Sequence, residues 1–356
     1  MRICIITSPF GALPPTAVGA VEKLFHQLAG EWVRNGHQVS FVCAGGGDNS
    51  KINYVRLKRY ERTGSTKTDL IWDFLYSLKA LWTAPKADIL LCNTFWSPAL
   101  APLVRWKYKK LIYGVHRYPK GQFFLYPFVH KFICVSAAVA DPLKKQVAAQ
   151  RVCVVVNPID TEVFKFEPRQ IVQGRVLYAG RVHPLKGLRC LAEACGRLFA
   201  EGIVKELVLV GPYELSKGGG GDTFVEEIKA AAVGCPVMLT GAISDSAELA
   251  KIERTAGVFV YPSEDGMGEA CPVAPMEAMA IGVPTVVSGL KCFDEFVCDG
   301  VNALKFELGK VDSLVKKLRA VLCDESVRAR IGSAAAQDAI RFSIANVARQ
   351  YLREFE

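Results

Sequence analysis

Short apolar runs alternate with helix-like segments along almost the whole chain, and this alternation constrains the fold more than any other feature. In the first half the runs include RICIITS, QVSFVCA, ADILLCN and KFICVSA, and in the second half RVLYAGR, ELVLVG, GVFVYPS and VPTVVSG. Such runs, rich in β-branched residues and separated by segments of helical period, are typical of βαβ units. The pattern predicts an α/β protein with parallel sheets that carry helices on both faces.

The periodic pattern lapses once, in the polar and proline-containing segment VVNPIDTEVFKFEPRQIVQG, and resumes after it. A chain of 356 residues is long enough for two domains that each have a core. We therefore expect one domain at residues 1–168, a second at 169–340, and a final helix at 341–356. Both domains are expected to be doubly wound, with ligands at the carboxyl ends of the strands.

The net charge of +9 is unevenly distributed along the chain. Residues 1–165 hold 22 Lys and Arg against 10 Asp and Glu, whereas the remainder holds 22 against 25. A basic N-terminal half suits an anionic partner, such as a phosphorylated substrate or acidic lipid headgroups, and a merely basic solvated surface is the alternative. No recognised nucleic-acid motif occurs, so nucleic acid is not an expected partner.

Several features indicate a cytoplasmic protein. The twelve cysteines stand singly without a CxxC pair, which favours reduced thiols over disulfides or a zinc site. The first residues read as a strand instead of a signal peptide, and no run of eighteen uncharged apolar residues occurs. DLIWDFLYSLKALWTAPK and RWKYKK mix aromatic and basic residues, so peripheral contact with the inner face of a membrane is one interpretation. The other interpretation is that the first segment is a core-facing helix and the second an ordinary basic turn.

Two glutamates eight positions apart, Glu269 and Glu277, lie in SEDGMGEACPVAPMEAMAIGVPTVV. Glu277 is near the start of a short predicted helix, where the helix dipole favours an acceptor group. Two carboxylates beside a glycine-rich loop suit a ligand with many hydroxyls. In YAGRVHPLKGL, Arg181 and Lys186 follow a strand and precede a helix, which suits a pyrophosphate.

Weaker signals lie elsewhere. His116 ends the predicted strand KLIYGVH, and Gly19 opens the first helix, where backbone N–H groups can meet a phosphate. The run KGGGGD, at residues 217–222, lacks the Gly-Lys-Ser/Thr ending of a phosphate loop and is predicted to be a mobile loop.

These segments resemble the retaining nucleotide-sugar glycosyltransferases of family four, which have the GT-B fold. The resemblance is most specific at residues 261–288, and the Gly180-Arg181 pair with Lys186 agrees with it. It implies two Rossmann-like domains that face an interdomain cleft, and a C-terminal helix that crosses back to the N-terminal domain. Ala270 and Cys271 depart from the family pattern, which usually has an aromatic residue and a glycine there.

The resemblance assigns roles to individual residues. Glu277 would bind the donor ribose, Glu269 and His116 would orient the transferred sugar, and Arg181 and Lys186 would stabilise the leaving diphosphate. The implied catalytic residues are Glu269, His116, Arg181 and Lys186. The implied donor-binding residues are Gly19, Gly180, Arg181, Lys186, Gly211, Thr240, Gly241, Cys271, Pro272, Val273 and Glu277.

The implied activity is that of a retaining hexosyltransferase that uses a nucleotide-diphospho-sugar, UDP-linked before GDP-linked. The acceptor would be a glycan or lipid-linked glycan in surface polysaccharide biosynthesis. No cofactor and no metal is expected, because no Asp-x-Asp motif and no ligand cluster with metal spacing occurs. A non-catalytic nucleotide-sugar-binding subunit and a GT-B-like epimerase are the alternatives.

Overall fold

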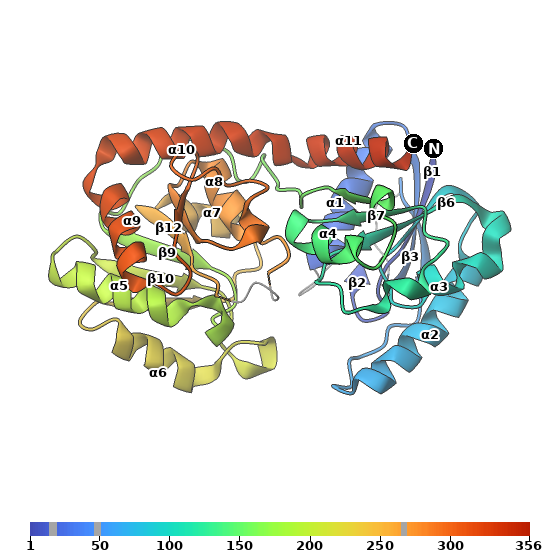
Figure 1. Ribbon diagram of the computed structural model, residues 1–356, viewed down its shortest axis with the longest axis horizontal. Helices are drawn as coiled ribbons and strands as arrows, with labels where there is room; N and C mark the ends of the chain where they lie inside the picture. Colours follow the sequence, from blue (N-terminus) through green and yellow to red (C-terminus); the bar gives the residue numbers. More distant parts are fainter. Residues whose placement is uncertain (14–19, 46–50, 265–268) are drawn as a thin grey trace. The chain divides into compact units, whose positions relative to one another are not determined.

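The computed structural model describes residues 1–13, 20–45, 51–264 and 269–356. They form two compact units (Figure 1). The first unit comprises Met1–Pro158 and Ile344–Glu356, and the second comprises Ile159–Ser343. The first segment thus ends at Pro158, ten residues before the boundary at residue 168 that the sequence predicts.

The first unit is built on a parallel sheet with the order β2-β3-β1-β5-β6-β7-β8, and β4 pairs with β3 beside this path. Its strands are β1 Arg2–Ile6, β2 Ala12–Leu13, β3 Gln38–Gly45, β4 Asn53–Leu57, β5 Ala87–Cys92, β6 Tyr108–Val115, β7 Lys131–Cys134 and β8 Val152–Val154. Its α-helices are α1 Ala20–Arg34, α2 Thr66–Thr83, α3 Ser97–Leu100, α4 Ala137–Lys144 and α11 Ile344–Phe355. All of these strands are parallel, and the order in which the chain adds them reverses between β1 and β5.

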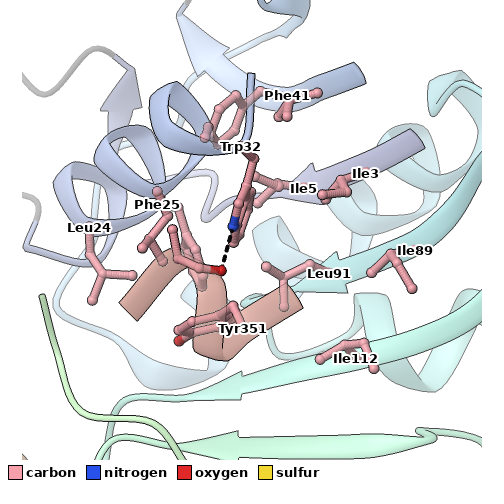
Figure 2. Packing of buried hydrophobic residues seen from close by; sticks show 14 of the residues in the cluster. Ile3, Ile5, Leu24, Phe25, Trp32, Phe41, Ile89, Leu91, Ile112 and Tyr351 are labelled. Carbon is pink, nitrogen blue, oxygen red and sulfur yellow. Dashed lines mark hydrogen bonds between the residues drawn. The ribbon is translucent and has the colours of Figure 1, made fainter. Parts of the chain in front are cut away.

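The core of the first unit includes the last helix of the chain. Helix α1 has a buried apolar stripe that contains Phe25 and Trp32, and α11 contributes Tyr351 and Phe355 to the same cluster (Figure 2). The indole Nε1 of Trp32 donates a hydrogen bond to the carbonyl of Ala348 at 3.0 Å. The prediction that the C-terminal helix returns to the N-terminal unit is therefore confirmed.

The second unit has a six-stranded parallel sheet with the order β11-β10-β9-β12-β13-β14. Its strands are β9 Arg175–Ala179, β10 Glu206–Val210, β11 Val237–Gly241, β12 Val258–Tyr261, β13 Thr285–Ser288 and β14 Leu304–Phe306. Its α-helices are α5 Leu188–Ala200, α6 Gly221–Ala231, α7 Ser246–Arg254, α8 Ala274–Ile281, α9 Val311–Cys323 and α10 Glu325–Ala339. This is the Rossmann order 3-2-1-4-5-6, so ligands are expected outside the carboxyl ends of β9 and β12, where the order reverses.

The predicted α/β class with two doubly wound parallel sheets is confirmed. All twelve cysteines are free thiols and most are buried; burial raises the pKa of the Cys4 thiol to about 12. In the described parts of the chain, no helix has both the length and the apolar character needed to cross a membrane.

Candidate active site

A buried ion pair lies at the carboxyl ends of β9 and β12 in the second unit. Lys186 ends a 3-10 turn, Pro184–Lys186, that follows β9, and Glu269 belongs to the segment between β12 and α8. The Lys186 Nζ atom contacts Glu269 Oε1, and the two residues are only 9% and 5% exposed. Opposite charges withdrawn from water in this way require further hydrogen bonds.

Two hydroxyl groups provide those hydrogen bonds. Ser263 Oγ donates to Glu269 Oε1 at 2.9 Å, and the Tyr261 hydroxyl donates to the same oxygen at 3.2 Å. Burial, followed by the charge of Glu269, raises the pKa of Tyr261 well above its ordinary value, which keeps its hydroxyl a donor. All three of these contacts are made by Oε1, and no described residue donates a hydrogen bond to Oε2 of Glu269.

Glycines allow the loops at this edge to pack closely. Gly187 has a φ of +66°, and a Cβ there would lie 2.0 Å from the carbonyl oxygen of Pro262. Gly211 has a φ of +139°, and a Cβ there would lie 2.0 Å from the carbonyl oxygen of Gly180. Both positions therefore require glycine for backbone reasons, independently of any ligand.

Arg181 and Lys186 have different surroundings, although the sequence predicts a common role for them in binding a pyrophosphate. Arg181 is exposed, and its Nη1 donates to the carbonyl of Gly218 at 3.4 Å. Its own carbonyl accepts from the Tyr178 hydroxyl at 2.9 Å, which holds the loop after β9. Lys186 is thus buried and paired with Glu269, whereas Arg181 is exposed to solvent.

The glycine run beside Arg181, predicted from the sequence as a mobile loop, forms a hydrogen-bonded turn that leads into α6. The N–H groups of Gly219, Gly220 and Gly221 donate to the carbonyls of Glu214, Val182 and Tyr213 at 2.7–2.9 Å. A Cβ on Gly219 would lie 2.2 Å from the carbonyl oxygen of Tyr213. The glycines permit this close contact between backbones.

The structure places most predicted donor-binding residues along one edge of the second sheet. Gly180, Gly211 and the Thr240-Gly241 pair end or directly follow β9, β10 and β11. Cys271 and Pro272 are buried between β12 and α8, Val273 is half-buried, and the half-buried Glu277 occupies the first turn of α8. Gly19 lies outside the described residues.

Sequence reasoning missed a buried carboxyl next to Glu277. Glu253 of α7 is fully buried, and neither of its carboxyl oxygens has a hydrogen-bond partner. Burial raises its pKa well above the ordinary value, and the charge of Glu277 raises it further. The available signal was the spacing Ala250, Glu253, Ala256, which puts the glutamate on the buried face of the helix. Tyr261, the last residue of β12, and Ser263, two positions after it, were also missed.

His116 belongs to the first unit and directly follows β6. Its ring lies edge-on to Phe25, with ring centroids 5.3 Å apart, and its Nε2 is buried without a hydrogen-bond partner. Burial lowers the pKa of His116 to about 4, and the charge of Arg117 contributes. The imidazole is therefore neutral at physiological pH. It can accept or donate a hydrogen bond but carries no charge.

In the described residues, no three His, Cys, Asp or Glu side chains are grouped so that they could hold a metal ion.

Two Rossmann-ordered sheets, a C-terminal helix that returns to the first unit, and a buried cation–carboxylate pair at the reversal point of the second sheet define the GT-B class. The family model described as "Glycosyl transferases group 1" matches residues 162–338, and "Glycosyltransferase Family 4" matches residues 19–163. The chain belongs to the family-four glycosyltransferases and uses a nucleotide-sugar donor.

Two curated relatives indicate the range of the family. The lipopolysaccharide 1,2-N-acetylglucosaminetransferase of Salmonella typhimurium is 22% identical over an alignment that covers 98% of this chain and 97% of that protein. The phosphatidyl-myo-inositol mannosyltransferase of Mycolicibacterium smegmatis is 26% identical over 64% of this chain and 58% of its own length.

Solved structures share the fold over the whole chain. The sucrose-phosphate synthase of Thermosynechococcus elongatus has a TM-score of 0.80 at 16% identity, covering 99% of this chain and 97% of its own. Anabaena HepE, in complex with UDP and glucose, has a TM-score of 0.78 at 18% identity, covering 99% and 98%.

Proposed function

We propose that this protein is a retaining hexosyltransferase that moves a sugar from a UDP-sugar to a glycan or lipid-linked glycan acceptor in surface polysaccharide biosynthesis. The observation that carries the proposal is the buried Lys186–Glu269 pair at the reversal point of the second sheet. In this proposal Oε2 of Glu269 accepts hydrogen bonds from sugar hydroxyls, and Lys186 and Arg181 provide positive charge to the diphosphate.

In the proposed reaction, the acceptor hydroxyl oxygen bonds to the anomeric carbon as the bond from that carbon to the β-phosphate breaks. The new bond forms on the face that the diphosphate leaves, and a phosphate oxygen takes the acceptor proton. Lys186 and Arg181 stabilise the charge that develops on the diphosphate, which is the role that a metal ion would otherwise have. Glu277 accepts hydrogen bonds from the ribose, and the neutral His116 orients the sugar.

The nucleotide and the acceptor class rest on relatives. HepE was crystallised with UDP and glucose, which supports UDP as the first donor to test. The two curated relatives are named for lipopolysaccharide and phosphatidyl-myo-inositol, which supports an acceptor that is attached to lipid. A cytoplasmic protein that reaches such an acceptor would work at the inner face of the membrane.

A thermal-shift and turnover screen with UDP-, GDP-, ADP- and dTDP-sugars tests the donor. We expect UDP-sugars to stabilise the protein, by about 2.7 kcal/mol at a concentration 100 times the Kd. Glu277→Gln is expected to weaken donor binding about tenfold to a hundredfold, because a hydrogen bond to a charged acceptor contributes about 1.5–3 kcal/mol. Glu226→Gln, on the exposed surface of α6, is the matched control.

The same assay separates the alternatives. Slow donor hydrolysis or transfer that persists in EDTA would support metal-independent catalysis. Binding without any turnover would instead indicate the non-catalytic subunit for which the Ala270-Cys271 departure argues. If no nucleotide-sugar shifts the melting temperature, the proposal is wrong.

The low pKa of His116 predicts a loss of stability in acid. The unfolded chain takes up a proton near pH 6.5 whereas folded His116 does so near pH 4, so its contribution is present above pH 6.5 and is lost as pH falls toward 4. Between pH 7.5 and 5 we expect wild type to lose up to about 2 kcal/mol more than His116→Gln. Urea unfolding at both pH values measures this difference, and equal losses would show that His116 titrates normally.

A further inference from the structure

Helix α2 of the first unit is apolar on two faces. Its buried face includes Tyr76, Ala80 and Leu81. A second stripe, formed by Ile71, Leu75, Leu78 and Trp82, is exposed, and Trp82 is 70% exposed. Spacings of four, three and four residues put these side chains on one side of the helix. Packing in the described part of the first unit therefore accounts for only one of the two apolar faces. The buried face agrees with a core-facing helix, and the exposed face agrees with contact at a membrane surface.

The 3-10 helix η1, Ala101–Lys107, is bonded to the C-terminal end of α2. Lys107 Nζ donates to the carbonyl of Ala84 at 2.9 Å and to that of Leu81 at 3.3 Å, and it also contacts the carbonyl of Trp82. These bonds hold η1 against the C-terminal end of α2, which is labelled in Figure 1, and both elements lie in the first unit. On η1, Leu103 and Trp106 are exposed, so the two neighbouring elements together expose two tryptophans and several aliphatic side chains.

Positive charge adjoins the apolar surface. Arg105 of η1 lines a pocket of about 390 Å³ together with Pro127, Phe128, Val129, His130 and Arg151. Arg151 Nη1 donates to the carbonyl of Pro127 at 2.8 Å, but its Nε is buried without a hydrogen-bond partner. Among the residues that the structure describes, no carboxylate lines the pocket. Arg105 Nη1 donates to the carbonyl of Tyr108, and neither arginine forms an ion pair with a described carboxylate. Two such guanidinium groups beside the exposed Phe128 suit a phosphate on an apolar support.

We propose that α2, η1 and this arginine pocket form a docking surface for an anionic lipid bilayer. The tryptophans and aliphatic side chains enter the headgroup region, and Arg105 and Arg151 meet lipid phosphates. The excess of 22 basic over 10 acidic residues in positions 1–165 adds long-range attraction to such a membrane. This inference rests on the proposed function: a lipid-linked acceptor lies in a membrane, and docking on that membrane would bring the enzyme to it.

Co-sedimentation of the full chain with vesicles tests the proposal. We expect binding to phosphatidylcholine vesicles that contain 30% phosphatidylglycerol, little binding to pure phosphatidylcholine, and weaker binding at high salt. The double variant Leu75→Glu, Trp82→Glu is expected to bind anionic vesicles at least tenfold more weakly. Arg105→Gln with Arg151→Gln is expected to lose most of the preference for anionic lipid.

The controls use exposed apolar residues of the second unit. Leu215, which is 75% exposed, and Val233 are changed to Glu, and vesicle binding is expected to stay at the wild-type level. Stabilisation by the donor nucleotide is measured for every variant, and an unchanged shift shows that the fold and the donor site are intact. A failure of docking is thereby distinguished from a failure of the proposed transferase function.

Two results would overturn the proposal. One is wild-type vesicle binding by the Leu75→Glu, Trp82→Glu variant. The other is the absence of wild-type binding to anionic vesicles at low salt, whether or not sedimentation velocity also shows a concentration-dependent dimer that Trp82→Glu abolishes. Such a dimer would assign the surface to self-association.

Discussion

Replacing Lys186 with methionine is expected to abolish transfer and to lower the free energy of unfolding by about 3–5 kcal/mol. Methionine retains the length of the lysine stem but removes the charge that neutralises Glu269. The carboxylate, only 5% exposed, would then rely on the hydroxyls of Tyr261 and Ser263. A buried charge without its counterion is far more costly than the pair is stabilising, which is why the single change has a large effect.

A double variant separates stability from catalysis. Lys186→Met combined with Glu269→Gln leaves no uncompensated charge, so most of the lost stability is expected to return, whereas transfer is not. Urea unfolding and donor turnover are measured for both single variants and the double variant. Lys229→Met, which breaks an exposed ion pair with Glu226, should change stability by less than about 1 kcal/mol. Activity in the double variant would show that this pair is not the catalytic centre.

Glu253→Gln is expected to stabilise the protein at neutral and alkaline pH. Burial and the neighbouring charge of Glu277 raise the folded-state pKa of Glu253 well above 4.5, the value for the unfolded chain. Above pH 4.5 the unfolded chain releases this proton and the folded chain retains it. Stability from the protonated carboxyl is therefore fully present below pH 4.5 and decreases as the pH rises toward the folded-state value, by up to about 1.4 kcal/mol per pH unit.

Glutamine resembles the protonated carboxyl in shape but does not titrate, so the difference in unfolding free energy between variant and wild type should widen from pH 5 to pH 8. Chemical denaturation at several pH values measures that difference. Glu248→Gln, on the exposed side of the same helix, is expected to follow wild type throughout. Parallel curves for Glu253→Gln and wild type would mean that Glu253 is ionised in the folded protein.

The fold was predictable because strand and helix periods are local properties. Runs such as RVLYAGR and GVFVYPS became β9 and β12, and the parallel pairing followed from the helices between them. The return of α11 to the first unit was predicted from the resemblance to family four. In the structure it is explained by contacts such as that between Trp32 and Ala348, which are 316 positions apart.

The candidate site was predictable in residue type but not in pairing. Arg181 and Lys186 look equivalent in sequence, yet one is exposed and the other is buried against a carboxylate 83 positions away. Similarly, nothing in KGGGGD distinguishes a mobile loop from a turn held against Tyr213 and Val182.

By itself, then, the sequence determined the α/β class, the two parallel sheets and the family, because hydrophobic period and short motifs depend on neighbouring residues. Only the tertiary structure decided that Lys186 neutralises Glu269, that Glu253 is enclosed beside Glu277, and that the apolar stripe of α2 faces outward. Burial and charge pairing depend on which distant segments pack together, and that is a property of the folded chain.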